Sequence, residues 1–200
     1  MSLVQFDGPA GLLEGMYDEG GAGPIGSCAV LCHPHPLYGG SMHDAVLEAL
    51  SDAFRRRQIP ALRFNFRGVG GSAGSHDDGD GEMQDVLAAV DWVRQQSGRS
   101  ELILCGYSFG AAMAIKAAAA SACSRLVLVA PPVTLIHGLS QPEQPACVIL
   151  GSEDQFVDAA GAQDFFGETA GVHVIEGADH FFFGAHGTII QLAGYALDGV

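Results

Sequence analysis

Residues 101–120 read ELILCGYSFGAAMAIKAAAA, and this stretch decides the fold. Residues 101–105 have the short apolar pattern of a buried strand, and residues 109–120 are rich in alanine, the strongest helix former. Between them, Gly106-Tyr-Ser-Phe-Gly110 matches G-x-S-x-G, in which a serine lies on a sharp turn from strand to helix. The flanking glycines leave the space that such a bend needs. The stretch therefore predicts a strand–turn–helix unit with Ser108 as a candidate nucleophile.

A second match to the same pattern lies at Gly70-Gly-Ser-Ala-Gly74. The chain has 28 glycines in 200 residues, so matches by chance are expected. A strand is expected to end several residues before Ser72, and no helix is expected to begin directly after it. Because the strand–turn–helix context is missing there, Ser108 is the better candidate.

Outward from this unit, short β-rich runs alternate with segments of helical periodicity. We expect strands at residues 27–32, 61–66, 101–105, 125–130, 146–150 and 172–175, and helices at residues 41–57, 82–96, 109–120, 158–166 and within 181–197. Ser41 and Asp44 resemble a capping box at the first helix. The first 20 residues resemble an antiparallel hairpin that turns at Gly8-Pro9. This order predicts an α/β fold, with a mainly parallel sheet covered by helices on both faces.

Length and charge limit the possible functions. With 200 residues, the chain is expected to form one domain over residues 1–200. It has 9 Lys and Arg against 23 Asp and Glu, a formal net charge of −14. This balance argues against nucleic acid and against an anionic membrane surface as partners. No apolar run reaches the roughly 20 residues of a membrane-spanning helix.

The cysteines indicate reduced thiols. Their number is odd, and no two of them form a CxxC pair, so no disulfide framework is expected. This usage predicts a cytoplasmic location. The five are Cys28, Cys32, Cys105, Cys123 and Cys147.

Two patterns that could indicate a cofactor are weak. His33, His35 and His43 lack the spacing of a further metal ligand, so no metal is expected. Gly68-Val-Gly-Gly-Ser-Ala73 fits a loose dinucleotide-binding pattern, but no helix is expected to begin directly after it. The neighbouring Arg67 is expected to anchor adjacent loops. The chain is therefore predicted to act without a cofactor.

A nucleophilic serine needs a base, and the base needs an orienting acid, each placed after its own strand. In a sheet of this type, functional residues lie beyond the carboxyl ends of the strands. His173 lies in the last expected strand and His186 in the final expected helix, so His180 is the one histidine in the turn after that strand. Asp154 follows the strand before it, in a turn led by Gly151 that would bring its carboxylate back over the sheet. Asp154 is preferred to Glu153 for that reason. Asp158 is a weaker alternative that is expected to cap the helix it opens.

Several stretches together carry a family resemblance. They are HPHPLYGGS at residues 33–41, RFNFRGVGGS at 63–72, GYSFG at 106–110, GSED at 151–154 and GADH at 177–180. With them, nearly the whole chain resembles the small lidless bacterial α/β-hydrolases related to the dienelactone hydrolase family. The resemblance implies the α/β-hydrolase fold and a triad of Ser108, Asp154 and His180. Dienelactone hydrolase itself has a cysteine as its nucleophile, so a dienelactone substrate is not expected here.

An oxyanion hole requires two backbone N–H donors. Phe109, which follows the nucleophile, is expected to supply one of them. The other is expected from residues 33–40, where the two prolines have no N–H and leave His35, Leu37 and Tyr38. The His-Gly-x-x-Gly pattern of the family favours Leu37.

Only 15 residues, 131–145, separate two of the expected strands, which is too short for a cap domain. The site is therefore predicted to be an open cleft, lined by Tyr38, Tyr107, Val133, Phe156 and Phe181. We expect a monomeric or homodimeric serine esterase that cleaves small or extended acyl esters through an acyl-enzyme. The alternatives are a thioesterase or peptidase of the same fold, and a non-catalytic α/β-hydrolase-like binding protein.

Overall fold

The structure is a computed structural model that describes residues 1–21, 26–136 and 138–198. Within these residues the strands form one sheet of eight, in the order β1-β2-β4-β3-β5-β6-β7-β8. β1 with β2, and β2 with β4, pair antiparallel, and the remaining neighbours pair parallel. The strands are β1 (Ser2–Gly8), β2 (Gly11–Asp18), β3 (Ser27–Cys32), β4 (Ala61–Phe64), β5 (Glu101–Tyr107), β6 (Arg125–Val129), β7 (Ala146–Gly151) and β8 (Ala170–Ile175).

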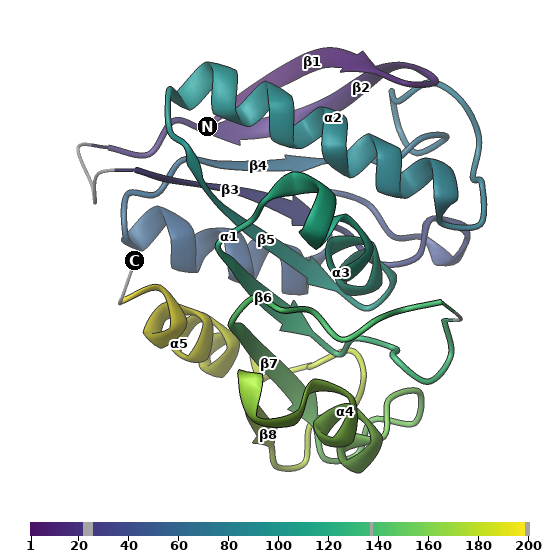
Figure 1. Ribbon diagram of the computed structural model, residues 1–200, viewed down its shortest axis with the longest axis vertical. Coiled ribbons are helices and arrows are strands. Elements are labelled where there is room, and N and C mark those ends of the chain that lie inside the picture. The colour runs from purple at the N-terminus through teal and green to yellow at the C-terminus, as the bar shows by residue number, and fades with distance from the viewer. Residues whose placement is uncertain (22–25, 137, 199–200) are drawn as a thin grey trace.

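Helices cover both faces of the sheet, as predicted. In the view of Figure 1, α2 and α3 lie in front of the sheet, and α1 lies behind it, packed against α5. The α-helices are α1 (Ala45–Arg56), α2 (Asp80–Ser97), α3 (Phe109–Ser121), α4 (Ala159–Phe166) and α5 (His186–Leu197). The short 3₁₀ helices are η1 (Pro36–Tyr38) and η2 (Gly167–Thr169). None of the helices in the described ranges is long and apolar enough to cross a membrane.

One helix begins later than predicted, and the last helix lies within its predicted range. α1 starts at Ala45, because the Asp44 carboxylate accepts the N–H groups of the first helical turn and makes Asp44, not Ser41, the N-cap. α5 starts at His186, inside the predicted range of 181–197. The Asp179 carboxylate accepts the N–H of Phe181 at 3.0 Å, and this holds the segment before α5 in a turn.

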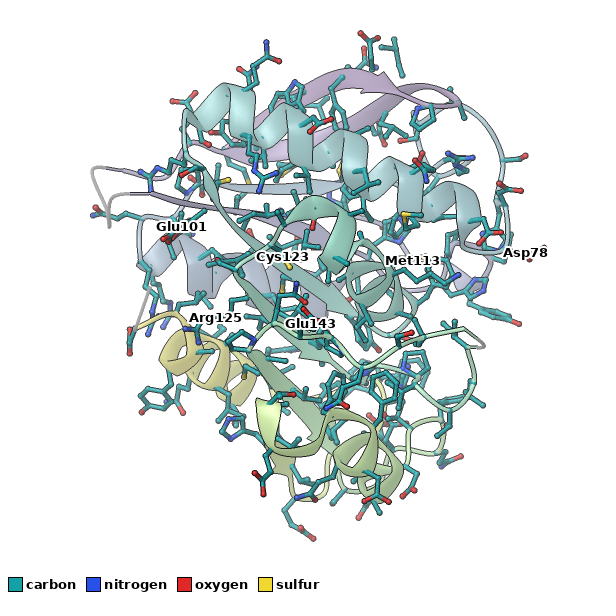
Figure 2. The ribbon with its side chains drawn as sticks, in the orientation of Figure 1. Asp78, Glu101, Met113, Cys123, Arg125 and Glu143 are labelled. Carbon is teal, nitrogen blue, oxygen red and sulfur yellow. The ribbon has the colours of Figure 1, made fainter. Side chains whose placement is uncertain are left out.

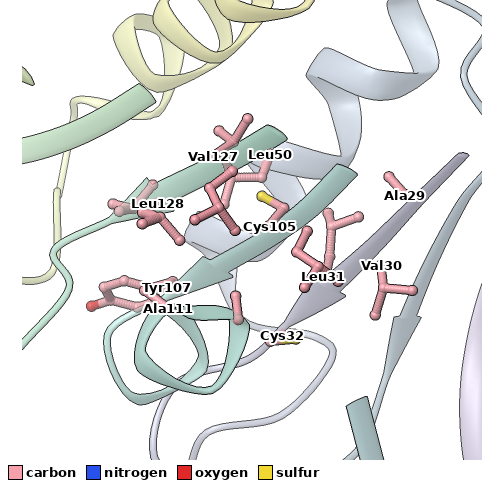
Figure 3. Close-up of a cluster of buried hydrophobic side chains, with 14 of the residues drawn as sticks. Ala29, Val30, Leu31, Cys32, Leu50, Cys105, Tyr107, Ala111, Val127 and Leu128 are labelled. Atoms are coloured by element: carbon pink, nitrogen blue, oxygen red, sulfur yellow. The ribbon is translucent and has the colours of Figure 1, made fainter. Parts of the chain in front are cut away.

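The core lies between the central strands and the helices. Figure 3 shows apolar side chains of β3, β5 and β6 meeting there, with Leu50 of α1 on one side and Ala111 of α3 on the other. All five cysteines are free and buried, and burial raises the pKa of the Cys105 thiol far above its usual range. These cysteines act as small apolar core residues.

The carboxyl ends of the parallel strands all lie at one end of the sheet. Glu101 and Arg125 begin β5 and β6 at the opposite end, and Figure 2 shows both far from Asp78, which projects into solvent. At the carboxyl end, the Arg67 guanidinium after β4 is bound by both carboxylate oxygens of Asp85 on α2, at 2.7 and 3.0 Å. This buried pair anchors the loop after β4 to α2, the role expected for Arg67.

Candidate active site

Ser108 lies on the turn between β5 and α3, with φ of 53° and ψ of −121°. Its backbone N–H donates to Val129 O at 2.9 Å, so the turn is fixed to β6. A Cβ on Gly106 would overlap the carbonyl group of Gly110, and one on Gly110 would overlap the carbonyl group of Cys32. Because the backbone segments approach each other so closely, only glycine fits on both sides of Ser108.

The structure brings Ser108, His180 and Asp154 together from three separate turns. His180 Nε2 lies 3.0 Å from Ser108 Oγ, and His180 Nδ1 lies 2.7 Å from Asp154 Oδ2. The three turns follow β5, β8 and β7, at the carboxyl ends of the strands, as predicted. This geometry is a continuous hydrogen-bonded chain from a carboxylate through an imidazole to a serine hydroxyl.

The Asp154 carboxylate is fully buried but well supplied with donors. Its Oδ1 accepts the N–H groups of Phe156 at 2.8 Å and Val157 at 3.0 Å. Burial raises the pKa of Asp154, but the hydrogen bond from His180 and these two N–H groups outweigh it and lower the pKa overall. An ionised Asp154 accepts a hydrogen bond from the N–H at His180 Nδ1, which leaves Nε2 free to accept a hydrogen bond from the Ser108 hydroxyl.

The two rejected carboxylates lie elsewhere. Glu153 is exposed, and its backbone N–H donates to Ala178 O at 2.9 Å. Asp158 caps α4, where its side chain accepts the N–H of Gly161 at 2.9 Å. Neither side chain has a contact with His180 in the described structure.

The structure argues against Leu37 as an oxyanion donor. Its N–H already donates to the His35 side chain at Nδ1, 3.2 Å away, and the N–H of Tyr38 donates to His35 O at 3.1 Å. Among the described residues, no acceptor contacts the N–H of His35 or of Phe109. The family pattern that favours Leu37 gives no sign that the His35 ring caps the 3₁₀ turn.

A cavity of about 970 Å³ opens over the triad. Four of the predicted cleft residues, Tyr38, Tyr107, Phe156 and Phe181, line it. Val133 does not, because it packs against the hydrophobic core, and the apolar wall after β6 comes instead from its neighbours. Those neighbours are Pro132, Leu135 and Ile136.

The opposite wall is polar, and sequence reasoning did not assign it. His76 Nδ1 lies 2.7 Å from the buried Glu82 Oε1, and the His76 ring lies 5.0 Å from that of His35. The Nζ atom of Lys116, on α3, lies 3.6 Å from Asp80 Oδ1. His76 lies in a glycine- and aspartate-rich loop without periodicity, so no sequence pattern pointed to it.

His33 is engaged structurally. Its Nε2 accepts the N–H of Phe66 at 3.0 Å, and its Nδ1 donates to Pro34 O at 2.6 Å. With both ring nitrogens occupied, His33 has no lone pair for a metal. Within residues 1–21, 26–136 and 138–198, no group of three or more His, Cys, Asp or Glu side chains could hold a metal ion.

Ser72, in the second G-x-S-x-G match, is also structural. Its buried hydroxyl donates to Asn65 O at 2.6 Å and accepts the N–H of Glu14 at 3.0 Å. These contacts join the loop after β4 to β2, so the Ser72 hydroxyl is not presented to the cavity.

The fold and the site together define a class of protein. Residues 30–139 match the model of the alpha/beta hydrolase fold family, and the chain belongs to that family. It is 35% identical over 198 residues to an uncharacterised protein of Rickettsia prowazekii, covering 91% of this chain and 82% of that protein.

Two solved structures are similar over almost the whole chain. One is an alpha-beta serine hydrolase homologue from Coxiella burnetii, with 33% identity and a TM-score of 0.91, covering 98% of this chain and 97% of that one. The other is XC6422 from Xanthomonas campestris, described as an a/b serine hydrolase without lid, with 33% identity and a TM-score of 0.87. It is matched over 100% of this chain and 96% of its own. These likenesses agree with the lidless architecture and support a hydrolase.

Proposed function

We propose that this protein is a serine hydrolase that cleaves carboxylic esters through an acyl-enzyme. The observation that carries the proposal is the chain of hydrogen bonds from Asp154 through His180 to Ser108. Ser108 Oγ attacks the ester carbonyl carbon while His180 Nε2 takes its proton. His180 then protonates the leaving alcohol, and a water activated by the same imidazole hydrolyses the acyl-enzyme. Asp154 holds the imidazole in the required tautomer.

The N–H groups of Phe109 and His35 are proposed to hold the oxyanion. Both residues line the cavity beside Ser108, and neither N–H has an acceptor within the described residues. The Phe109 N–H is the first of α3, so the positive end of the helix dipole adds to its effect. His35 replaces Leu37 in this role, since the N–H of Leu37 is already engaged.

The proposed substrate is a small-molecule ester whose apolar part lies against Leu135, Ile136 and Phe156. The reaction needs only side chains and backbone groups of this chain, so it requires no cofactor. Free, buried thiols support a cytoplasmic setting for this enzyme. We propose that it acts as a monomer or a homodimer.

The two serines in G-x-S-x-G sequences provide the test. A fluorophosphonate probe should label the wild type and Ser72→Ala but not Ser108→Ala. On short p-nitrophenyl esters, kcat/KM of Ser108→Ala should fall by about 10⁴-fold or more, as for loss of a triad nucleophile. Ser72→Ala is the matched control, since it has the same local sequence pattern without the triad contacts. A wild type that is neither labelled nor active would indicate the non-catalytic binding protein instead.

A further inference from the structure

Tyr107 immediately precedes the candidate nucleophile, and its side chain contacts the other end of the site. The hydroxyl donates to the backbone carbonyl of His180 at 2.8 Å. The ring centroid lies 5.5 Å from that of the His180 imidazole and 6.3 Å from that of Phe182. Only 3% of Tyr107 is exposed, so the contact is shielded from water. Tyr107 lines the cavity as expected, and its hydroxyl makes this contact in addition.

The other hydrogen bonds of the loop after β8 lead elsewhere. Ala178 O accepts the N–H of Glu153 at 2.9 Å, and Gly177 N–H donates to Ser152 Oγ at 2.8 Å. Both bonds fix the loop to the turn after β7, which carries Asp154. They hold the His180 loop to the turn that carries Asp154, and neither bond reaches the turn that carries Ser108.

Within the part of the chain that the structure describes, one side-chain hydrogen bond outside the triad joins the His180 loop to the Ser108 turn. That bond is the one from the Tyr107 hydroxyl. Since Tyr107 ends β5, a buried central strand, its hydroxyl has a fixed starting point. The side chain therefore spans from the rigid element that carries the nucleophile to the loop that carries the imidazole.

We infer that Tyr107 is a positioning residue that holds His180 Nε2 within hydrogen-bond range of Ser108 Oγ. The inference rests on the proposed function. Proton transfer from Ser108 requires this short separation, and displacements of about 1 Å in such sites can reduce rates about a hundredfold. A phenylalanine would fill the same space but leave the His180 carbonyl without this donor.

The test compares Tyr107→Phe with Tyr195→Phe. Tyr195 is a matched control, because it lies on α5, is 72% exposed and makes no hydrogen bond through its hydroxyl within the described residues. In Tyr107→Phe we expect kcat on a short p-nitrophenyl ester to fall by about tenfold or more, with KM within about twofold of the wild type. Fluorophosphonate labelling should slow by a similar factor, because it uses the same attack by Ser108. Tyr195→Phe should match the wild type in all three.

A spectroscopic measurement separates positioning from a purely structural role. The ring-proton NMR signals of His180 should shift in Tyr107→Phe, because the ring moves relative to Asp154 and Ser108. A lower melting temperature with unchanged kcat, labelling rate and His180 ring-proton signals would overturn the inference. A raised KM with unchanged kcat would also overturn it, by making Tyr107 a substrate contact.

The two proposals can fail separately. Wild type and Ser108→Ala decide the hydrolase function by themselves, without any Tyr107 variant. The ring-proton NMR signals of His180 report the position of the imidazole even if no ester is turned over. If the hydrolase is active and Tyr107→Phe behaves like Tyr195→Phe in every readout, only the positioning role is wrong.

Discussion

Lowering the pH from 7 to 5 should destabilise the protein through His33, the buried histidine at the end of β3. His33 has no exposed surface, and burial is the main cause that lowers its pKa from about 6.5 to about 4. Its Nε2 must stay unprotonated to accept the N–H of Phe66. The folded protein therefore keeps His33 neutral at pH values where the unfolded chain binds a proton.

The sign and size follow from proton linkage. The folded-state pKa is the lower one, so the stabilisation is complete above about pH 6.5 and is lost as pH falls toward 4. With these two pKa values, the free energy of unfolding should fall by about 2 kcal/mol between pH 7 and pH 5. By pH 4 the loss should be about 3 kcal/mol.

Urea unfolding at pH 7, 6 and 5 measures this loss, and His33→Gln isolates it. A glutamine Oε1 can accept the N–H of Phe66 but cannot take up a proton in this range. The variant is expected to be less stable at pH 7 and to lose about 2 kcal/mol less than the wild type on going to pH 5. If both proteins lose the same free energy over this interval, His33 does not titrate with a lowered pKa and the reasoning is refuted.

Three further variants test the site and its support. Asp154→Asn should keep the fold but reduce kcat by about 10⁴-fold on a short p-nitrophenyl ester, because the imidazole then adopts the wrong tautomer; a loss below tenfold would contradict the role of Asp154. Gly110→Ala should strongly lower the melting temperature, because the new methyl overlaps the Cys32 carbonyl group. A melting temperature equal to that of the wild type would contradict this. Asp85→Asn should lower the free energy of unfolding by about 3 kcal/mol in urea, since it leaves the Arg67 guanidinium with only the more distant carboxylate of the exposed Asp77, 3.7 Å away. A change within about 1 kcal/mol, the size seen for exposed pairs, would show that the pair is not effectively buried.

Much of this architecture could be predicted because local and global signals agree. The run from Glu101 to Ser121 is strand-like, then glycine-flanked, then alanine-rich, and the structure forms β5, a sharp turn and α3 there. Asp154 and His180 could be placed together because each follows its own strand in a parallel sheet. The prediction that Asp158 caps α4 is confirmed for a similar local reason, as the cap bonds lie within three residues.

The errors arise where a side chain decides between backbone arrangements. The His35 ring accepts the N–H of Leu37, and this contact, invisible in the spacing of residues 33–41, removes Leu37 from the candidate donors. Asp44 caps α1 in place of Ser41, although both residues have side chains suited to the role. Val133 and Leu135 are both apolar, and only the course of the chain after β6 decides that one packs on the core and the other lines the cavity.

The loop that carries His180 follows β8, a strand that is less buried than the strands that precede Ser108 and Asp154. β5 and β7, which precede Ser108 and Asp154, are almost entirely buried. β8, which precedes His180, is at the edge of the sheet and has exposed residues along its length. Edge segments with few buried contacts open at a lower free energy than central strands.

Within the described residues no cap domain covers the loop after β8, and this loop is held by bonds from two sides. The turn after β7 contributes the Ser152 hydroxyl and the Glu153 N–H, and the end of β5 contributes the Tyr107 hydroxyl. Removing a bond from the first pair should loosen His180 from Asp154, whereas removing the Tyr107 bond should loosen it from Ser108. Because both bonds hold the same loop, the effects of Ser152→Ala and Tyr107→Phe on kcat are expected to be coupled, so that the double variant loses less than the product of the two single effects. A double variant as slow as that product would show that the two bonds act on His180 independently.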